Sequence, residues 1–192
     1  MFENAGVINE SNLDREFVTQ VASFPGGERI YSCLQCGTCS GSCQMSYAMD
    51  YTPRRLIEMT RVGMKKEVLS SKAIWYCAAC YLCTVRCPRQ VKLTEIMFAL
   101  KSLALREKLY AGKEDSPVLY TVFLDVLKRF GRSHEGLLMT SFAMKTNPFR
   151  LLPLAPMGLR MLAKGKLRII PARIRNVEEI RRLIQAAEEV RP

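Results

Sequence analysis

The chain has 192 residues, with 29 basic and 18 acidic side chains, so its formal net charge is +11 at pH 7. This length suits one domain with extensions or two small domains, and 48% apolar residues are too many for a disordered chain. The basic excess indicates a partner of opposite charge. A single histidine, His134, makes histidine-based zinc sites and serine or cysteine triads hard to assemble.

The N-terminal residues lack a basic segment followed by an apolar core, so we expect no secretory signal. No stretch of the chain reaches the roughly 18 uninterrupted apolar residues of a membrane span. We therefore expect a cytoplasmic protein without membrane contact. In that reducing compartment, clustered cysteines indicate metal ligands before they indicate disulfides.

The elements predicted for the N-terminal half are helices. One helix is predicted over residues 11–23, capped by Ser11, because apolar residues recur there at four-residue spacing. A second helix begins at Thr52, a cap followed by proline, and ends at Gly63. Its expected buried residues are Leu56, Ile57, Met59 and Val62. Shorter and longer helices follow over residues 65–69 and 94–109.

Helices are also expected in the C-terminal half. Ser116-Pro117 opens one of them. Its expected inward-facing residues are Leu119, Phe123, Val126 and Leu127. Residues 136–177 contain eight basic and no acidic side chains and several prolines, which predicts short helices and extended pieces. A last helix begins near Asn176. Because no stretch shows a convincing strand pattern, the predicted fold class is all-α.

All eight cysteines fall in one pattern that occurs twice. The first block has cysteines at positions 33, 36, 39 and 43, and the second block repeats the same spacing at positions 77, 80, 83 and 87. Three thiolates at two-residue intervals can curl around one corner of an iron–sulfur cubane. The fourth ligand must then come from elsewhere in the chain. The spacing therefore predicts two [4Fe–4S] clusters.

The fourth cysteine of each block is predicted to bind the cluster of the other block, as it does in two-cluster bacterial ferredoxins. The predicted ligands of cluster 1 are Cys33, Cys36, Cys39 and Cys87. The predicted ligands of cluster 2 are Cys77, Cys80, Cys83 and Cys43. Four-thiolate zinc sites are the alternative, but they usually separate two C-x2-C pairs by a dozen or more residues.

The spacing between the blocks favours a helical scaffold. Thirty-three residues separate Cys43 from Cys77, and a predicted helix occupies much of that stretch. A ferredoxin built from two βαβ-like halves would show strand signals beside each block, and none is found. The arrangement resembles the α-helical ferredoxin fold. We divide the chain into an N-terminal helical segment (1–28), a two-cluster helical ferredoxin domain (29–112) and a helical, basic C-terminal extension for subunit docking (113–192).

Two stretches resemble the C subunit of heterodisulfide reductases and its relatives in bacteria and archaea that do not make methane. They are YSCLQCGTCSGSC at 31–43 and IWYCAACYLCTVRCPRQVKLTEIMFALKSLA at 74–104. The likeness covers residues 30–110 and is weaker over the basic C-terminal part. It implies an electron-transfer subunit without catalysis of its own. In that family, the C subunit passes electrons from a flavin and iron–sulfur A subunit to a cysteine-rich catalytic B subunit, which reduces a disulfide.

The residues independently favour a carrier. If two clusters take eight cysteines, no thiol remains for disulfide exchange, and no glycine-rich dinucleotide fingerprint is present. We therefore expect no direct small-molecule substrate. Two alternatives stay open: an iron–sulfur subunit of another respiratory or dehydrogenase complex, and a module in which the clusters are structural.

The basic segment is interpreted as a surface for partner subunits rather than for nucleic acid or a membrane. Its Lys and Arg residues alternate with Leu, Ile, Met and Pro, whereas a phosphate-tracking stripe is less apolar. An ordinary solvated face is a further alternative. His134 is interpreted as a surface or interface residue, most methionines as core residues, and Trp75 as a packing residue beside cluster 2.

Overall fold

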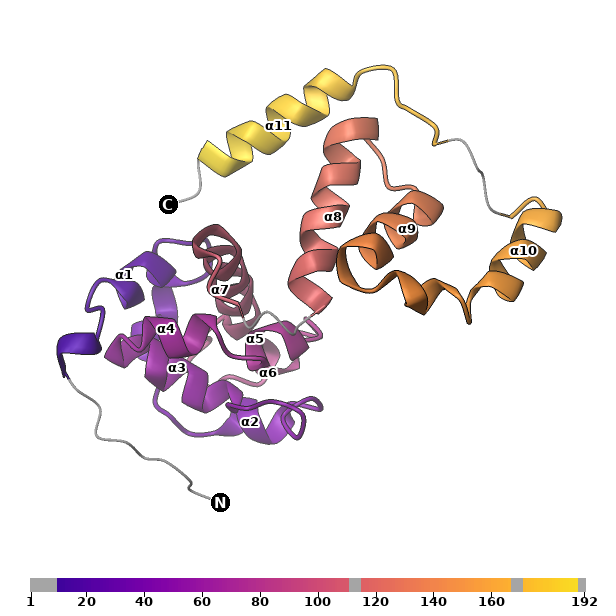
Figure 1. Ribbon diagram of the computed structural model, residues 1–192. Helices are drawn as coiled ribbons and strands as arrows, with labels where there is room; N and C mark the ends of the chain where they lie inside the picture. Colours follow the sequence, from indigo (N-terminus) through magenta and orange to yellow (C-terminus); the bar gives the residue numbers. More distant parts are fainter. Residues whose placement is uncertain (1–9, 111–114, 167–170, 190–192) are drawn as a thin grey trace. The chain divides into compact units, whose positions relative to one another are not determined.

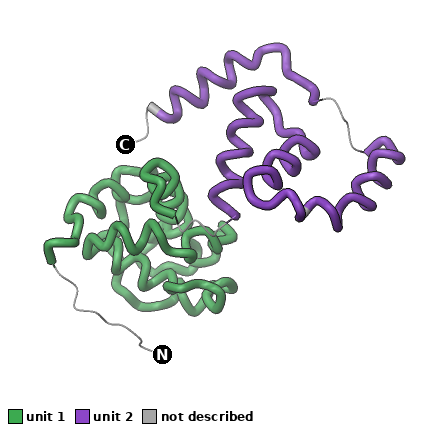
Figure 2. Tube along the Cα trace, in the orientation of Figure 1, with its two compact units in different colours: residues 1–112, 192 green, residues 113–191 purple. Residues whose placement is uncertain are grey.

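Every regular element that the computed structural model describes is helical (Figure 1). The described residues are 10–110, 115–166 and 171–189. The predicted all-α class is therefore confirmed for these residues. The chain divides into two compact units, residues 1–112 and residues 113–191 (Figure 2). In the described part of the chain, no helix combines the length and apolar character that crossing a bilayer requires.

The first unit consists of short helices gathered around one longer helix. In chain order its elements are η1 (Glu10–Asn12), α1 (Phe17–Ala22), η2 (Glu28–Ser32), α2 (Thr38–Ser42), α3 (Pro53–Val62), α4 (Lys65–Leu69), α5 (Ala73–Tyr76), α6 (Leu82–Val85) and α7 (Leu93–Glu107). Helices α1, α4, α5 and α6 all pack against α7. The buried face of this helix is mostly apolar and belongs to the core of the unit.

The core of the first unit agrees with the predicted helix faces. Leu56, Ile57 and Met59 of α3 are buried as predicted, whereas Val62 at the end of that helix is exposed. Met97 of α7 is also buried, but the interpretation of most methionines as core residues is wrong, because Met59 and Met97 are the only buried ones among the described methionines. The other large buried side chains include Phe17, Ile30, Leu69, Ile74, Ile96 and Leu100. One continuous apolar cluster thus supports the loops that carry the cysteines.

The prediction of a single helix over 11–23 is wrong. The chain makes one 3-10 turn at residues 10–12 and enters α1 only at Phe17. Between them, the backbone N–H of Asp14 donates to the carbonyl of Gly63 at 2.8 Å, so this segment is tied to the end of α3 instead of continuing a helix. Gly63 has φ +94°, and a Cβ there would lie 2.5 Å from the Asp14 carbonyl oxygen. The close approach therefore requires glycine.

The second unit is built on α8. Its elements are α8 (Asp115–Phe130), α9 (Glu135–Thr146), η3 (Pro148–Leu151), α10 (Ala155–Ala163) and α11 (Val177–Glu189). Helices α9 and α11 pack against α8, and η3 packs against α9. The short helices between residues 136 and 177 agree with the proline content of that segment.

The predicted inward face of α8 is largely wrong. Val126 is buried, but the side chains of Leu119 and Phe123 are 41% and 39% exposed. The buried residues of the helix are Pro117, Val122 and Val126, and the last two lie one turn apart. The helix is apolar around much of its circumference, so its sequence does not fix which stripe its neighbours cover.

The interpretation of His134 as a surface residue is also wrong. The side chain is only 8% exposed, and its Nδ1 accepts a hydrogen bond from the backbone N–H of Leu137 at 3.1 Å. His134 is thus the N-cap of α9, a position that usually has Ser, Thr, Asp or Asn. Its imidazole nitrogen satisfies one of the helix's free N–H groups.

Candidate metal centre

The two cysteine blocks follow the same backbone path. Each block begins directly after a short helical turn, η2 for Cys33 and α5 for Cys77. The two cysteines have nearly equal torsion angles, with φ −66° and ψ 122° for Cys33 and φ −63° and ψ 111° for Cys77. The sequence repeat is therefore a repeat of conformation as well as of ligand type.

Left-handed backbone conformations recur at matching positions of the two loops. Gln35 and Ala79, which precede the second cysteine of each block, have φ 58° and 53°. Gly37 and Tyr81, which follow it, have φ 82° and 61° and are the N-cap residues of α2 and α6. Such turns bend the loop tightly enough to bring its cysteines to one side. Non-glycine residues in this region store on the order of 1–3 kcal/mol, so the fold must hold them in place.

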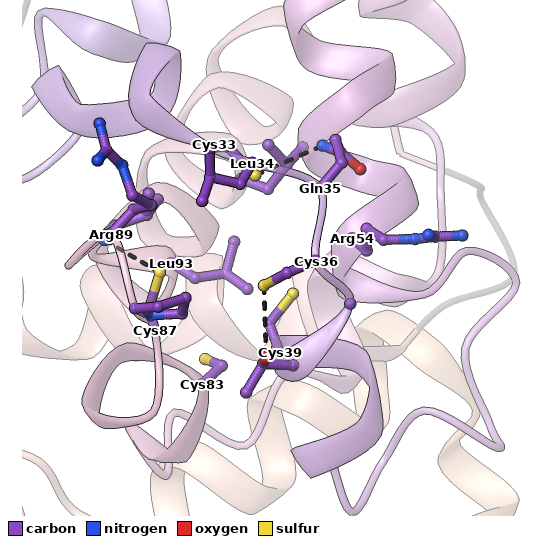
Figure 3. Close-up of a pocket in the computed structure, with 15 residues that line it drawn as sticks. Cys33, Leu34, Gln35, Cys36, Cys39, Arg54, Cys83, Cys87, Arg89 and Leu93 are labelled. Atoms are coloured by element: carbon purple, nitrogen blue, oxygen red, sulfur yellow. Dashed lines mark hydrogen bonds between the residues drawn. The ribbon is translucent and has the colours of Figure 1, made fainter.

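Helices α2 and α6 pack against each other, and this contact brings the two blocks together. A first cavity forms on one side of the pair. Five cysteines line it: Cys33, Cys36, Cys39, Cys83 and Cys87. In Figure 3, Cys36 and Cys39 lie across the space from Cys87, and Cys83 lies at its edge. The first three cysteines of one block and the fourth of the other thus face the same space.

A second cavity repeats this arrangement with the blocks exchanged. The cysteines that line it are Cys43, Cys77, Cys80 and Cys83. Cys83 lies at the boundary and contributes to both linings, as does the buried side chain of Leu93. All eight cysteines of the chain therefore line one or both of two adjacent cavities, and none is part of a disulfide.

The thiols differ in their surroundings. A hydrogen bond with the hydroxyl of Thr38, 3.4 Å from Sγ, lowers the pKa of the exposed Cys36 thiol below its usual range. Burial raises the pKa of Cys39, and burial likewise raises the pKa of Cys77. Buried thiols favour the protonated form, and metal binding must displace their protons.

The donor set fits iron–sulfur clusters better than single metal ions. Within residues 10–110, 115–166 and 171–189, no group of three or more Cys, His, Asp or Glu side chains is placed to hold one ion. The sulfurs instead surround spaces, as ligands of a polynuclear cluster do. Thiolates alone are the usual ligands of [4Fe–4S] clusters. The residues present therefore fit such a group.

One hydroxyl from each block caps the helix that follows the block. Ser40 Oγ accepts a hydrogen bond from the backbone N–H of Arg54 at 3.0 Å, in the first turn of α3. Thr84 Oγ1 accepts from the N–H of Thr94 at 3.3 Å, in the first turn of α7. Ser40 and Thr84 each directly follow the third cysteine of their block. Each loop is thus tied to a helix of the core.

This contact corrects the predicted cap of α3. The helix begins at Pro53 as predicted, but the side chain of Thr52 makes no capping hydrogen bond. The capping oxygen comes from Ser40, fourteen residues earlier. A cap supplied at such a distance carries no local sequence signal.

Asp50 is a further long-range cap that the sequence did not reveal. Its carboxylate accepts hydrogen bonds from the backbone N–H groups of Lys72 and Ala73, both at 2.9 Å. These groups lie at the start of α5, which leads directly into Cys77. A carboxylate at a helix N-terminus is favourable because it satisfies free N–H groups and complements the helix dipole.

A cation approaches the first cysteine of each block. The guanidinium of Arg61 donates to the Cys33 carbonyl, and the ammonium of Lys101 donates to the Cys77 carbonyl, both at 3.3 Å. Lys101 is only 7% exposed. Trp75, also 7% exposed, belongs to the apolar core and lines neither cavity, in agreement with a packing role.

Comparison with known protein families agrees with this geometry. Residues 29–91 match the family model described as a 4Fe-4S dicluster domain. The match covers both cysteine blocks. It supports iron–sulfur clusters as the cofactor, and a count of two fits a dicluster domain.

Curated relatives carry related names. Over 106 residues, the chain is 39% identical to the C subunit of the H(2):CoB-CoM heterodisulfide,ferredoxin reductase of Methanothermobacter thermautotrophicus, covering 55% of each chain. It is 40% identical over 81 residues to the C subunit of the ferredoxin:CoB-CoM heterodisulfide reductase of Methanosarcina mazei, covering 42% of this chain and 50% of that one. An Archaeoglobus profundus protein described as like the C subunit of heterodisulfide reductase is 33% identical over 99 residues, covering 51% of this chain and 52% of its own.

These findings confirm the resemblance that the cysteine-bearing stretches indicated. The chain spans about half the length of the curated relatives it matches.

The two hydroxyl caps generate a prediction. Ser40→Ala and Thr84→Ala each leave one helix-end N–H without its partner, so each lowers the free energy of unfolding by about 1 kcal/mol. Each variant also loosens the adjoining block and loses metal faster. Denaturant unfolding and the rate of iron loss to a chelator, both under anoxia, measure the two effects. Ser46→Ala, in the turn that follows α2, is the control and changes neither quantity. Wild-type values in both cap variants would contradict the prediction.

Proposed function

We propose that this homologue of the heterodisulfide reductase C subunit is an electron-transfer subunit that holds two [4Fe–4S] clusters. The observation that supports this function is the pair of adjacent cavities, lined by five and four cysteines, each with cysteines of both blocks. When bound, such clusters supply the capacity to store and exchange single electrons. Two of them in adjacent cavities form a relay between protein partners.

The proposed ligands follow the cavity linings. Cys33, Cys36, Cys39 and Cys87 hold the centre at the first cavity, and Cys43, Cys77, Cys80 and Cys83 hold the centre at the second. Cys83 also contributes to the first lining, and we assign it to the second because that assignment gives each centre four thiolates. The apolar side chain of Leu93 is buried and lines both sites.

The remaining chemistry of the first unit favours a carrier over an enzyme. With eight thiolates used as ligands, the chain has no cysteine for disulfide exchange. Cys36 and Cys80 are the exposed members of the two sets, one at each cavity. Each site therefore has an edge at the surface that a partner can approach closely. Electron donor and acceptor can thus bind at different places on the unit.

The partners belong to the same proposal. The names of the relatives describe subunits of reductases of a heterodisulfide. By analogy, electrons pass from a flavin and iron–sulfur A subunit to a cysteine-rich B subunit that reduces a disulfide, in the cytoplasm. The chain itself then binds no small-molecule substrate.

Metal analysis and redox titration test the central claim. Protein purified under anoxia should contain about eight iron and eight sulfide per chain. Both centres should be reduced and reoxidised reversibly, each by one electron. Stoichiometric zinc would contradict the proposal. Clusters that do not cycle would favour a structural role.

Cysteine replacements test the crossed ligation, in which the fourth cysteine of each block binds the cluster of the other block. Because the fourth ligand comes from the other block, Cys87→Ser should alter the same centre as Cys33→Ser. By the same reasoning, Cys43→Ser should alter the same centre as Cys77→Ser. Electron paramagnetic resonance of the reduced proteins identifies which of two signals changes in each variant. The crossed assignment is wrong if Cys87→Ser alters the signal that Cys77→Ser alters.

The segment from η3 to α10 supports the proposed docking role of the C-terminal extension. Its side chains contribute little to the core of the second unit, since no residue of α10 is buried. Large apolar side chains are exposed along it: Phe149, Leu152, Met157, Leu159 and Leu162. The basic residues Arg160 and Lys164 lie one turn apart among them. An apolar surface bordered by cations fits a partner subunit with an acidic rim.

Replacing the exposed apolar side chains of this surface should weaken the binding of partner subunits without affecting the binding of the clusters. We expect the combined substitution of Met157, Leu159 and Leu162 by Ser to reduce co-purification of the partner subunits at least tenfold, while iron content stays at the wild-type level. Quantitative mass spectrometry of the anoxic complex measures both. A matched triple serine variant at the exposed Thr140, Gln185 and Ala186 is the control. Undiminished co-purification of the α10 variant would contradict the docking role.

A further inference from the structure

Charged side chains are distributed unequally around the two cavities. Among the described residues, the lining of the first cavity includes Arg54 and Arg89 and no carboxylate. The lining of the second cavity includes no charged side chain at all. It contains three methionines, Met45, Met49 and Met97. The same set of ligands is therefore placed in two different electrostatic environments.

Hydrogen bonds to the cysteine sulfurs show the same inequality. In residues 10–110, three such bonds reach the first set of cysteines. They are from Gln35 Nε2 to Cys33 Sγ at 3.5 Å, between Thr38 Oγ1 and Cys36 Sγ at 3.4 Å, and from the Val91 N–H to Cys87 Sγ at 3.3 Å. In the second set, Thr94 Oγ1 lies 3.7 Å from Cys83 Sγ, and the backbone N–H of Ala79 also donates a hydrogen bond to Cys77.

The cations that donate to the first cysteine of each block do not add to the surplus of the first site. Arg61 at the Cys33 carbonyl and Lys101 at the Cys77 carbonyl occupy equivalent positions at equal distance. Lys101 is more deeply buried, and Arg61 lies 3.7 Å from the carboxylate of Glu58, so this pair by itself favours the second site. The two arginines in the lining of the first cavity remain as the surplus of the first site.

Positive charge and hydrogen-bond donors both stabilise the reduced form of a cluster. A [4Fe–4S] core with four thiolates has a charge of about −2, and the uptake of one electron makes it about −3. Cations and donors near the sulfurs lower the energy of the added charge, whereas apolar surroundings leave it unscreened.

We propose that Arg54 and Arg89 raise the reduction potential of the centre at the first cavity above that of the centre at the second. This inference rests on the proposed function. The two side chains are exposed and extend outward at different sides of the cavity, so their charges act from its rim (Figure 3). At equilibrium, the centre bound by Cys33, Cys36, Cys39 and Cys87 is reduced first. An electron donor then binds at the second site and an acceptor at the first.

A redox titration followed by electron paramagnetic resonance tests this assignment on the full chain under anoxia. Dithionite supplies one electron to each centre, and two midpoint potentials are expected. Arg54→Gln and Arg89→Gln should each shift the higher midpoint downward, and the double variant should shift it further. Arg54→Lys and Arg89→Lys keep the charge and should keep the midpoint near its wild-type value.

The chain offers a matched control for the arginine variants and a corresponding test at the second site. Arg55→Gln removes the same charge at the neighbouring position, where the guanidinium lies over the ring of Tyr51, and should leave both midpoints unchanged. Lys101→Met removes the cation of the second site and should shift only the lower midpoint downward. Equal wild-type midpoints, or a shift of the lower midpoint in Arg54→Gln and Arg89→Gln, would overturn the inference.

The outcomes also separate this inference from the proposed function. A preparation without iron, or with clusters that do not take up electrons reversibly, contradicts the electron-transfer function itself. Two reversible midpoints that do not respond to the arginine variants leave that function standing and reject only the role of Arg54 and Arg89.

Discussion

The contact between α2 and α6 is the constraint on which the first unit depends. It places two copies of one loop side by side, so that the end of each block reaches the cavity of the other. The arrangement brings together thiols whose ionised forms repel one another. Burial raises the pKa of Cys39, and the negative charge of the neighbouring Cys33 and Cys83 thiolates raises it further. A bound metal centre removes that conflict by neutralising thiolate charge, which couples folding of these loops to metal binding.

The helices between the blocks hold this arrangement in place. Ser40 and Thr84 tie each loop to the first turn of a core helix, and Asp50 ties the turn before Cys77 to the loop after the first block. These contacts join segments far apart in the sequence. The cysteines are therefore positioned by the core rather than by their own loops alone, as a preorganised binding site requires.

The spacing of the cysteines carried most of the information about the site, because ligand geometry limits which intervals can surround a cluster. Helix periodicity likewise predicted α3 and its buried Leu56 and Ile57. What the sequence could not supply depends on tertiary contacts: the bond between Asp14 and Gly63 that interrupts the expected first helix, the cap from Ser40, and the burial of His134. The left-handed turn at Tyr81 has no local signal either, although its equivalence to Gly37 in the repeat was visible.

The repeat also shows why identical ligands need not make identical sites. Both blocks supply the same number of thiolates through loops of the same conformation, so neither ligand type nor backbone geometry distinguishes them. The differences come from residues outside the repeated cysteine spacing: arginines from α3 and from the segment after Cys87 on one side, methionines on the other. A repeated motif fixes the chemistry of a pair of centres, and the surrounding side chains, which are free to differ, set the order of their potentials.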